Sequence, residues 1–374
     1  MTEIMSAAEL LQLDMDYAMA AARTELETMA GTSLLITGGA GFLGYGFVHL
    51  FDHWNQHAAP DQRIEVTVYD NFVRGRPAWL DALAERGAVT LGVVDMIQPL
   101  PAGFPDFDYV IHAAGIASPP FYRARPLETI DANINGLRNL LDHLRAQRER
   151  GREPRGFLFY SSSEIYGDPV ADAIPTPEDY RGNVSCTGPR ACYDESKRFG
   201  ETLCVVYHDQ FGLPITVARP FNNYGPGLKI TDRRVIPDFA RDMLEGRDIV
   251  MLSDGGPTRT FCYVADAIVG YIKVLVRGRG GQAYNIGIDR PEISVGTLAD
   301  LAVSTARELW GYAGKVVRGE ADEGDVYLVD NPARRCPDIT KARTELDFDP
   351  QITIEEGIRR SMIWYHHNPT AANA

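Results

Sequence analysis

The chain has 374 residues, of which 45% are hydrophobic and 24% are charged, a composition typical of a globular protein with a sizeable core. Its formal net charge of −14 argues against a general nucleic-acid or anionic-membrane surface, because both partners would repel it. No basic segment with a following apolar run stands at the N-terminus, so we expect neither a secretory signal nor a membrane span, and a cytoplasmic location. The 5 scattered cysteines, without a CxxC pair, suit reduced thiols better than a disulfide framework or a metal site.

The first part of the chain has a helical pattern. Residues from about 7 to 29 are rich in Ala, Leu, Met and Glu, with apolar side chains at helical spacing, and Gly31 ends the pattern. We therefore expect residues 1–32 to form a helical extension that packs on the core or on a second subunit.

From Ser33 onwards, short apolar strands alternate with longer helical segments. The expected strands are 33–37, 65–70, 89–94, 109–112, 157–160 and 215–218. This alternation predicts an α/β fold with a Rossmann-like doubly wound parallel sheet. After Pro226 the strands become irregular, which predicts a smaller C-terminal α/β lobe that holds a substrate.

A glycine-rich turn follows the first expected strand. Gly38, Gly41 and Gly44 give a tight turn, a bare backbone beneath a pyrophosphate and close helix packing, and the helix that follows offers free N–H groups. Asp70 ends the second strand, where it would accept hydrogen bonds from the adenosine ribose and repel a 2′-phosphate. NAD is therefore expected rather than NADP, although Arg74 and Arg76 lie nearby. The expected cofactor contacts before residue 120 are Gly38, Gly41, Phe42, Leu43, Gly44, Asp70, Asn71, Arg74, Asp95, Met96, Ala113 and Ala114.

Two further groups of side chains indicate a catalytic site. Tyr193 and Lys197 stand four residues apart on one helix face, where an ammonium group can lower the phenol pKa and make the tyrosine a general base. Ser162, Ser163 and Glu164 follow the fifth strand, at the sheet edge where ligands bind in this architecture. A carboxylate there is costly unless it is solvated or used, which favours an active-site role.

These segments resemble the extended short-chain dehydrogenase/reductases, the NAD-dependent epimerase/dehydratase family, and more closely its UDP-glucuronate decarboxylases, which make UDP-xylose. The resemblance covers nearly all of residues 33 to 360. It is carried by segments 70–75, 117–120, 161–169, 188–197, 258–263 and 335–341.

The resemblance implies a role for each candidate residue. Tyr193, assisted by Lys197 and Ser162, would remove the sugar 4-hydroxyl proton while hydride passes from C4 to NAD⁺, and both Tyr193 and Lys197 would also contact the cofactor. The 4-ketone then allows loss of CO₂, and NADH reduces the 4-ketopentose unless that species is released. Arg190 would hold the sugar carboxylate. Glu164 and Arg259, with Ser163, would return a proton to C5. The remaining expected substrate contacts are Asn222, Arg234, Tyr263 and Arg335, and surface ion pairs are the alternative for Arg234 and Arg335.

The same resemblance implies an NAD-binding domain over 33–225, to which 259–288 returns, and a nucleotide-sugar lobe over 226–258 and 289–374. It also implies a homodimer with a UDP-sugar as the favoured substrate. Gly227 stands where family members usually carry arginine, with Lys229 two positions later, so the nucleotide stays open.

Three alternatives remain. A nucleotide-sugar 4,6-dehydratase is weakened because Ser163 occupies the position of a dehydratase aspartate. A 4-epimerase is less expected because its reaction would give Glu164 no catalytic function. A non-catalytic NAD-sensing regulator would not need both Tyr193 and Lys197.

Overall fold

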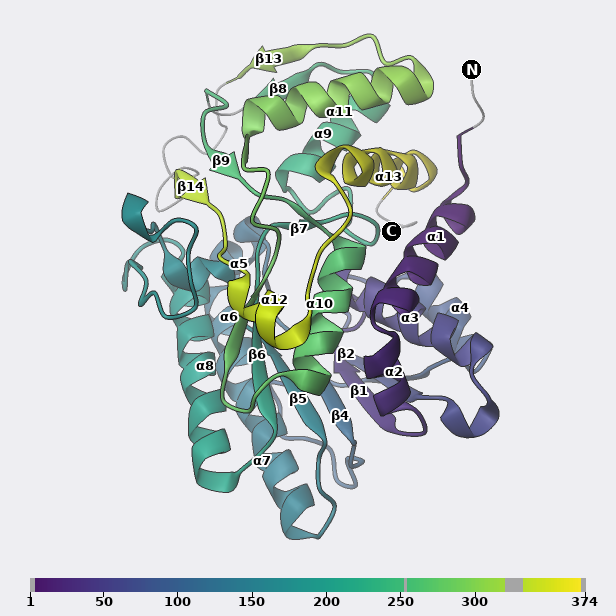
Figure 1. Ribbon diagram of the computed structural model, residues 1–374, viewed down its shortest axis with the longest axis vertical. Coiled ribbons are helices and arrows are strands. Elements are labelled where there is room, and N and C mark those ends of the chain that lie inside the picture. The colour runs from purple at the N-terminus through teal and green to yellow at the C-terminus, as the bar shows by residue number, and fades with distance from the viewer. Residues whose placement is uncertain (1–3, 252–253, 320–331, 371–374) are drawn as a thin grey trace.

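The computed structural model describes residues 4–251, 254–319 and 332–370. Within these residues, seven parallel strands form the central sheet in the order β11-β6-β5-β4-β1-β2-β3 (Figure 1). Its strands are β1 (Ser33–Thr37), β2 (Glu65–Asp70), β3 (Thr90–Val93), β4 (Tyr109–His112), β5 (Gly156–Tyr160), β6 (Ile215–Pro220) and β11 (Ala283–Ile286). The predicted Rossmann-like fold is confirmed, and the six expected strands are present with ends shifted by at most two residues.

Helices cover both faces of the sheet because its strands present apolar side chains on both sides. Leu34 and Ile36 of β1 pack into one core with α3 and α10, whereas Leu35 between them packs into a second core with α7 and α8. This pattern is typical of a buried parallel sheet. The helices are α1 (Ala7–Ala21), α2 (Arg23–Met29), α3 (Phe42–His57), α4 (Ala78–Glu85), α5 (Pro119–Ala124), α6 (Pro126–Asp131), α7 (Leu137–Glu149), α8 (Ala191–Phe211), α9 (Val235–Leu244), α10 (Val264–Arg277), α11 (Val295–Trp310), α12 (Thr340–Leu346) and α13 (Ile354–His367).

Short turns of helix complete the first part of the chain. They are the 3₁₀ turns η1 (Pro60–Gln62), η3 (Ser163–Tyr166) and η4 (Ala171–Ala173), and the π turn η2 (Ala132–Gly136). Turn η3 directly follows the sheet at the end of β5, so it brings its side chains to the carboxyl edge.

The C-terminal part of the chain forms a smaller lobe above this edge, where α9, α11 and α13 pack together (Figure 1). Its strands pair in the small sheets β10-β7, β12-β9-β14 and β13-β8. They are β7 (Asn223–Tyr224), β8 (Ile249–Met251), β9 (Thr258–Arg259), β10 (Cys262–Tyr263), β12 (Ile293–Ser294), β13 (Val316–Arg318) and β14 (Arg334–Arg335). The predicted lobe also includes residues 252–253, 320–331 and 371–374, which lie outside the described residues.

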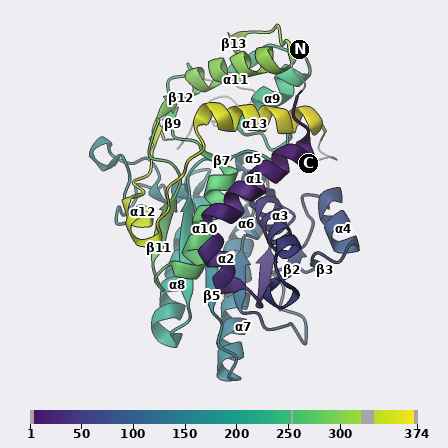
Figure 2. The same cartoon turned by 45° about the vertical axis from the view of Figure 1, so that its right-hand side comes forward.

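The N-terminal extension forms two helices where the sequence predicted one. A capping box between Ser6 and Glu9 begins α1, and α1 ends at Ala21 before α2 starts at Arg23. Leu10, Met15 and Ala18 of α1 are buried. Helix α1 packs on α10, α3 and α13, which joins the sheet layer to the smaller lobe (Figures 1 and 2). The extension therefore packs on the chain's own core.

No helix in the described ranges combines the length and apolarity needed to cross a bilayer.

Candidate active site

A cavity of about 720 Å³ lies between the carboxyl edge of the sheet and the smaller lobe. It is lined by residues that follow β1, β4 and β5 and by residues of the smaller lobe, so it occupies the place where ligands bind in doubly wound folds. Every predicted cofactor, catalytic and substrate residue except Tyr263 lines this cavity. Tertiary structure thus gathers candidates that are spread from residue 38 to residue 335.

The glycine turn makes the floor at one end of the cavity. Gly38 has φ +72°, and a Cβ there would lie 2.5 Å from the Cα of Ala114 on the neighbouring strand loop. A Cβ on Gly44 would collide with the backbone of Gly39. Helix α3 begins at Phe42 without a side-chain cap, so its N-terminal N–H groups remain available to an anion. This end of the cavity fits the pyrophosphate of a dinucleotide such as NAD.

Asp70 stands beside this floor with its carboxylate oriented by the backbone. Its oxygens accept hydrogen bonds from the N–H of Phe72 at 2.7 Å and of Ala40 at 3.0 Å. Burial raises the pKa of Asp70, and these hydrogen bonds oppose the shift. Each oxygen keeps a second acceptor position, which is what binding of ribose hydroxyls requires.

The structure explains why Gly227 stands at the position where family members usually carry an arginine. Gly227 has φ +88°, and a Cβ there would lie 2.7 Å from the Cβ of Tyr45, so this backbone has no room for an arginine side chain. Lys229 turns to the cofactor side, where its Nζ donates to the carbonyl oxygen of Arg74 at 3.0 Å. Arg74 itself pairs with Asp232 at 3.5 Å.

Tyr193 and Lys197 face the cavity from α8, but they do not act on each other as predicted. The Nζ of Lys197 donates to the carbonyl oxygen of Tyr160 at 2.8 Å and lies 5.7 Å from the centre of the Tyr193 ring. Burial raises the pKa of Tyr193 to about 12, and a hydrogen bond with Ser162 opposes that shift. Burial also lowers the pKa of Lys197 to about 7. The expected lowering of the phenol pKa by Lys197 is therefore absent in the chain alone, because desolvation dominates both groups.

Glu164 lies at the centre of an arginine cluster. Its carboxylate forms an ion pair with Arg190 and accepts a hydrogen bond from Arg335 Nη2 at 2.7 Å. Burial raises the pKa of Glu164, but Arg335, Arg190 and Arg259 outweigh burial and the net pKa is lowered. Asp194 also pairs with Arg190, at 3.5 Å, and burial beside Glu164 raises the pKa of Asp194 to about 7. The cluster is thus built to hold a carboxylate.

Arg259 approaches the same carboxylate while its guanidinium is tied to the smaller lobe. It donates to the carbonyl oxygens of Thr258, Pro332 and Ala333 at 2.7, 2.6 and 3.1 Å. The positive charge of Arg259 helps to lower the pKa of Glu164.

The expected nucleotide contacts separate into two places. Arg335 has an 11% exposed side chain and meets Glu164, so the surface ion pair considered as its alternative does not occur. Asn222 has φ +43°, and its Nδ2 donates to the carbonyl oxygen of Thr260 at 2.8 Å. Arg234, with a 34% exposed side chain, pairs with Asp232 at 3.0 Å at the mouth of the cavity.

Tyr263 is a correction to the predicted site. It is 0% exposed, it does not line the cavity, and its hydroxyl donates to Asp14 of α1 at 2.6 Å. Asp14 also accepts from Arg360 of α13 at 2.7 Å. Tyr263 serves the packing of the N-terminal extension, and its expected contact with substrate is wrong.

Tyr122 is a site residue that the sequence analysis missed. Its ring stacks on Tyr193 with centroids 5.1 Å apart and planes 11° apart, and it lines the cavity. Tyr122 lies two residues beyond the segment 117–120 that the resemblance singled out, and nothing local in the sequence indicates a stacking partner 71 residues later.

The described residues contain no group of three or more His, Cys, Asp or Glu side chains that could hold a metal ion. All five cysteines lie in the described part of the chain, and each is a free thiol.

Comparison with known proteins agrees with this geometry. The family model described as NAD dependent epimerase/dehydratase family matches residues 34–287. UDP-glucuronic acid decarboxylase 6 of Arabidopsis thaliana is 37% identical over 87% of this chain and 86% of its own length. UDP-glucuronic acid decarboxylase 1 of Xenopus tropicalis is 35% identical over 89% of this chain and 72% of its own length.

Among solved structures, UDP-glucose 4-epimerase of Thermotoga maritima, determined with UDP-glucose, is similar with a TM-score of 0.73 and 25% identity, covering 90% of this chain and 99% of that one. The similarity in fold agrees with the Rossmann-like sheet described above. The chain belongs to the NAD dependent epimerase/dehydratase family.

Proposed function

We propose that the chain decarboxylates UDP-glucuronate with bound NAD, yielding UDP-xylose or its 4-keto pentose. The observation that carries this proposal is the pairing of Arg190 and Arg335 with one buried carboxylate, Glu164, in the cavity that also contains Tyr193. Guanidinium forks are the side chains best suited to recognise a planar carboxylate. The two decarboxylase relatives support the same substrate.

Tyr193 carries out the first proton transfer. Its phenolate takes the proton of the sugar 4-hydroxyl, and Ser162 steadies the phenolic oxygen by a hydrogen bond. When bound, NAD⁺ would supply the hydride acceptor for C4. Return of that hydride gives UDP-xylose with no net redox change, whereas release of the 4-keto pentose would leave the cofactor reduced. Lys197 lies beside this pair and is anchored on the carbonyl oxygen of Tyr160. Because burial lowers its pKa to about 7, its amine is divided between the charged and neutral forms near neutral pH.

The arginine cluster serves the second step. With a ketone at C4, the carboxylate on C5 is in the β position, and CO₂ leaves with its electron pair delocalised into an enolate. Arg190 holds the carboxylate before it leaves, in the place where it now pairs with Glu164. A substrate carboxylate there adds a like charge beside Glu164, which raises the pKa of Glu164 and favours its protonated form. Glu164, with Arg259 and Ser163, is then suited to return a proton to C5.

The test is incubation of the protein with NAD⁺ and UDP-glucuronate, followed by mass spectrometry of the nucleotide product and measurement of released CO₂. We expect CO₂ and a UDP-pentose, and at least about 100-fold slower formation of both with Tyr193→Phe. In a parallel incubation with UDP-glucose, loss of water from this neutral hexose nucleotide would support the dehydratase instead. A UDP-hexuronate of unchanged mass but altered chromatographic position would support the epimerase.

We also propose that the uridine diphosphate lies along Asn222 and Arg234, which line the cavity on the side of the smaller lobe. Competition by UDP, GDP and dTDP against UDP-glucuronate tests the choice of base. We expect UDP to compete best, whereas equal inhibition by all three would leave the diphosphate as the recognised group.

A homodimer through α6 and α8 is part of the proposal. These two helices pack together, and they expose Leu127 at 71%, Phe199 at 49% and Val205 at 40%. Such an apolar surface is typical of an interface. Light scattering should give a dimer for the native chain and a monomer for Phe199→Asp, while Val93→Asp on exposed β3 should stay dimeric.

The free thiols support the further proposal of a cytoplasmic location.

A further inference from the structure

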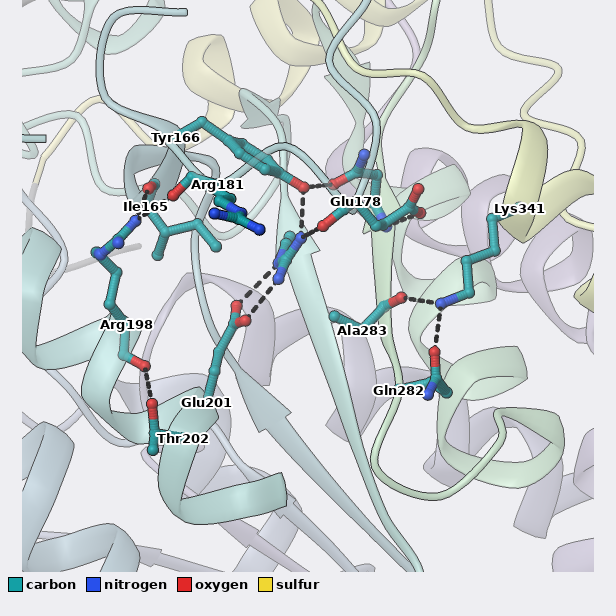
Figure 3. Close-up of polar contacts among 12 residues, drawn as sticks. Ile165, Tyr166, Glu178, Arg181, Arg198, Glu201, Thr202, Gln282, Ala283 and Lys341 are labelled. Carbon is teal, nitrogen blue, oxygen red and sulfur yellow. Dashed lines mark hydrogen bonds and ion pairs between the residues drawn. The ribbon is translucent and has the colours of Figure 1, made fainter. Parts of the chain in front are cut away.

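A buried polar network lies beneath the turn that carries Glu164 (Figure 3). Arg219 on β6 donates to both carboxylate oxygens of Glu201 on α8, at 2.9 and 2.6 Å. The same guanidinium donates to the hydroxyl of Tyr166 at 2.7 Å and to the carbonyl oxygen of Glu178 at 2.7 Å. The Tyr166 hydroxyl in turn donates to Asn285 Oδ1 at 2.7 Å. The network therefore joins β6, α8, η3 and β11.

Asn285 extends this network to the segment that carries Arg335. Its Nδ2 donates to the carbonyl oxygens of Thr176 at 2.9 Å and Asp338 at 3.0 Å. The two segments also bind each other directly, because the Thr176 amide donates to the Cys336 carbonyl at 2.8 Å and the Asp338 amide donates to the Thr176 carbonyl at 3.0 Å. Cys336 follows Arg335 in the chain, so the backbone next to Arg335 is fixed by these bonds.

A second anchor holds the same segment farther along. Lys341 donates to the carbonyl oxygen of Ala283 at 2.8 Å and to Gln282 Oε1 at 3.0 Å, at the start of β11 (Figure 3). The late segment 335–341, one of those that carry the family resemblance, is thus bound to β11 through Asp338 and Lys341.

These bonds close a circuit. Tyr166 stands two residues after Glu164, Asn285 connects Tyr166 to the backbone beside Arg335, and Arg335 returns to Glu164 at 2.7 Å. Tyr166 is 1% exposed and Asn285 is 0% exposed, so they act on the site through other residues. The buried side-chain polar atoms of Tyr166, Asn285 and Arg219 all have hydrogen-bond partners, and a buried network satisfied in this way is rigid and favours one arrangement.

We propose that Tyr166 and Asn285, supported by Arg219, are positioning residues that set the Arg335 guanidinium against Glu164 for the decarboxylation step. This inference rests on the proposed function, since it assigns these residues to the pair that handles the carboxylate and the C5 proton. Their hydrogen bonds, and not their bulk, carry the effect.

The test is a double-mutant cycle with Tyr166→Phe and Arg335→Ala, measured as kcat on UDP-glucuronate. Tyr166→Phe should lower kcat about 10-fold in the native background and by less than about 2-fold in the Arg335→Ala background, because residues that act through one another are not additive. The dissociation constant of NAD should stay unchanged. Equal factors in both backgrounds would overturn the inference.

Tyr284→Phe is the matched control. Tyr284 precedes Asn285 on β11, it is fully buried, and its hydroxyl donates to Glu345 at 2.8 Å, outside the circuit. Loss of this hydroxyl should lower the melting temperature as Tyr166→Phe does, while kcat stays within about 2-fold of the native value. A fall in kcat as large as that of Tyr166→Phe would assign both effects to general stability and overturn the inference.

Amide hydrogen exchange of the ligand-free chain separates this inference from the proposed function. Tyr166→Phe should speed exchange at the amides of Thr176 and Asp338 about 10-fold, and Tyr284→Phe should leave them unchanged. Unchanged exchange in Tyr166→Phe overturns the positioning role, whatever the substrate is. Absence of CO₂ release by the native chain, with the expected exchange result, overturns only the proposed function.

Discussion

The carboxylate of Glu164 and the guanidinium of Arg335 meet at 2.7 Å although 171 residues separate them in the chain. Arg190 pairs with the same carboxylate from the start of α8. A substrate that brings its own carboxylate to this place must share the two arginines with Glu164. The cluster therefore links recognition of an acidic sugar to the protonation state of Glu164, because each added negative charge raises the pKa of the other.

Replacement of Arg190 by alanine should weaken acidic substrates selectively. The change removes one partner of a buried charge pair, so we expect kcat/KM on UDP-glucuronate to fall at least about 100-fold, equivalent to about 3 kcal/mol. Calorimetric titration should show a much smaller change in the affinity for UDP-glucose. Arg145→Ala, on the exposed side of α7, is the control. Equal losses of affinity for both sugars would show that Arg190 does not read the carboxylate.

Replacement of Tyr193 by phenylalanine should slow the reaction at the oxidation step, before CO₂ is lost. Removal of a general base lowers rates by about 100-fold to 10,000-fold, and the change leaves the buried ring and its stack on Tyr122 in place. Single-turnover absorbance of the reduced cofactor at 340 nm checks the oxidation step directly. Retained NAD binding by the variant is the control, and normal formation of reduced cofactor would contradict the assignment.

Lys197 makes the stability of the native chain depend on pH. Its pKa is lowered by burial from 10.5 to about 7, so between these values the unfolded chain binds one more proton than the folded chain. The free energy of unfolding of the native chain, relative to Lys197→Met, should therefore rise with pH from about 7 to about 10, by up to about 1.4 kcal/mol per pH unit. Urea unfolding of both proteins across this range checks the sign. A difference that is constant or falls with pH would mean that Lys197 stays charged in the folded chain.

Asp14 should hold the N-terminal extension in place. Burial raises its pKa to about 6, so at pH 7.5 it is ionised and pairs with Arg360 while it accepts from Tyr263. Asp14→Ala leaves both partners buried without it and should lower the free energy of unfolding by about 3 kcal/mol. Asp16→Ala, two residues along α1, removes a 55% exposed partner of His53 and should cost about 1 kcal/mol or less. Similar losses in the two variants by urea unfolding would deny Asp14 this role.

Much of the cofactor half of the site follows from local patterns in the sequence. The strand ends at Thr37 and Asp70, the glycine spacing and the Tyr193/Lys197 spacing each depend on residues close together in the chain, where period and turn chemistry decide the structure. The sheet then brings the ends of its parallel strands to one edge, so residues predicted one by one line a single cavity.

Tertiary structure alone decided which partner each polar or charged side chain of the site takes. Arg335 pairs with the buried Glu164 and does not form a surface ion pair. Tyr263 donates a hydrogen bond to Asp14 of the extension, and Lys197 donates one to the carbonyl oxygen of Tyr160. The sequence by itself determined the strands, the glycine turn and the family resemblance, because these rest on neighbouring residues. The charge pairs join residues up to 346 positions apart, and burial in the assembled fold sets both their geometry and their pKa values.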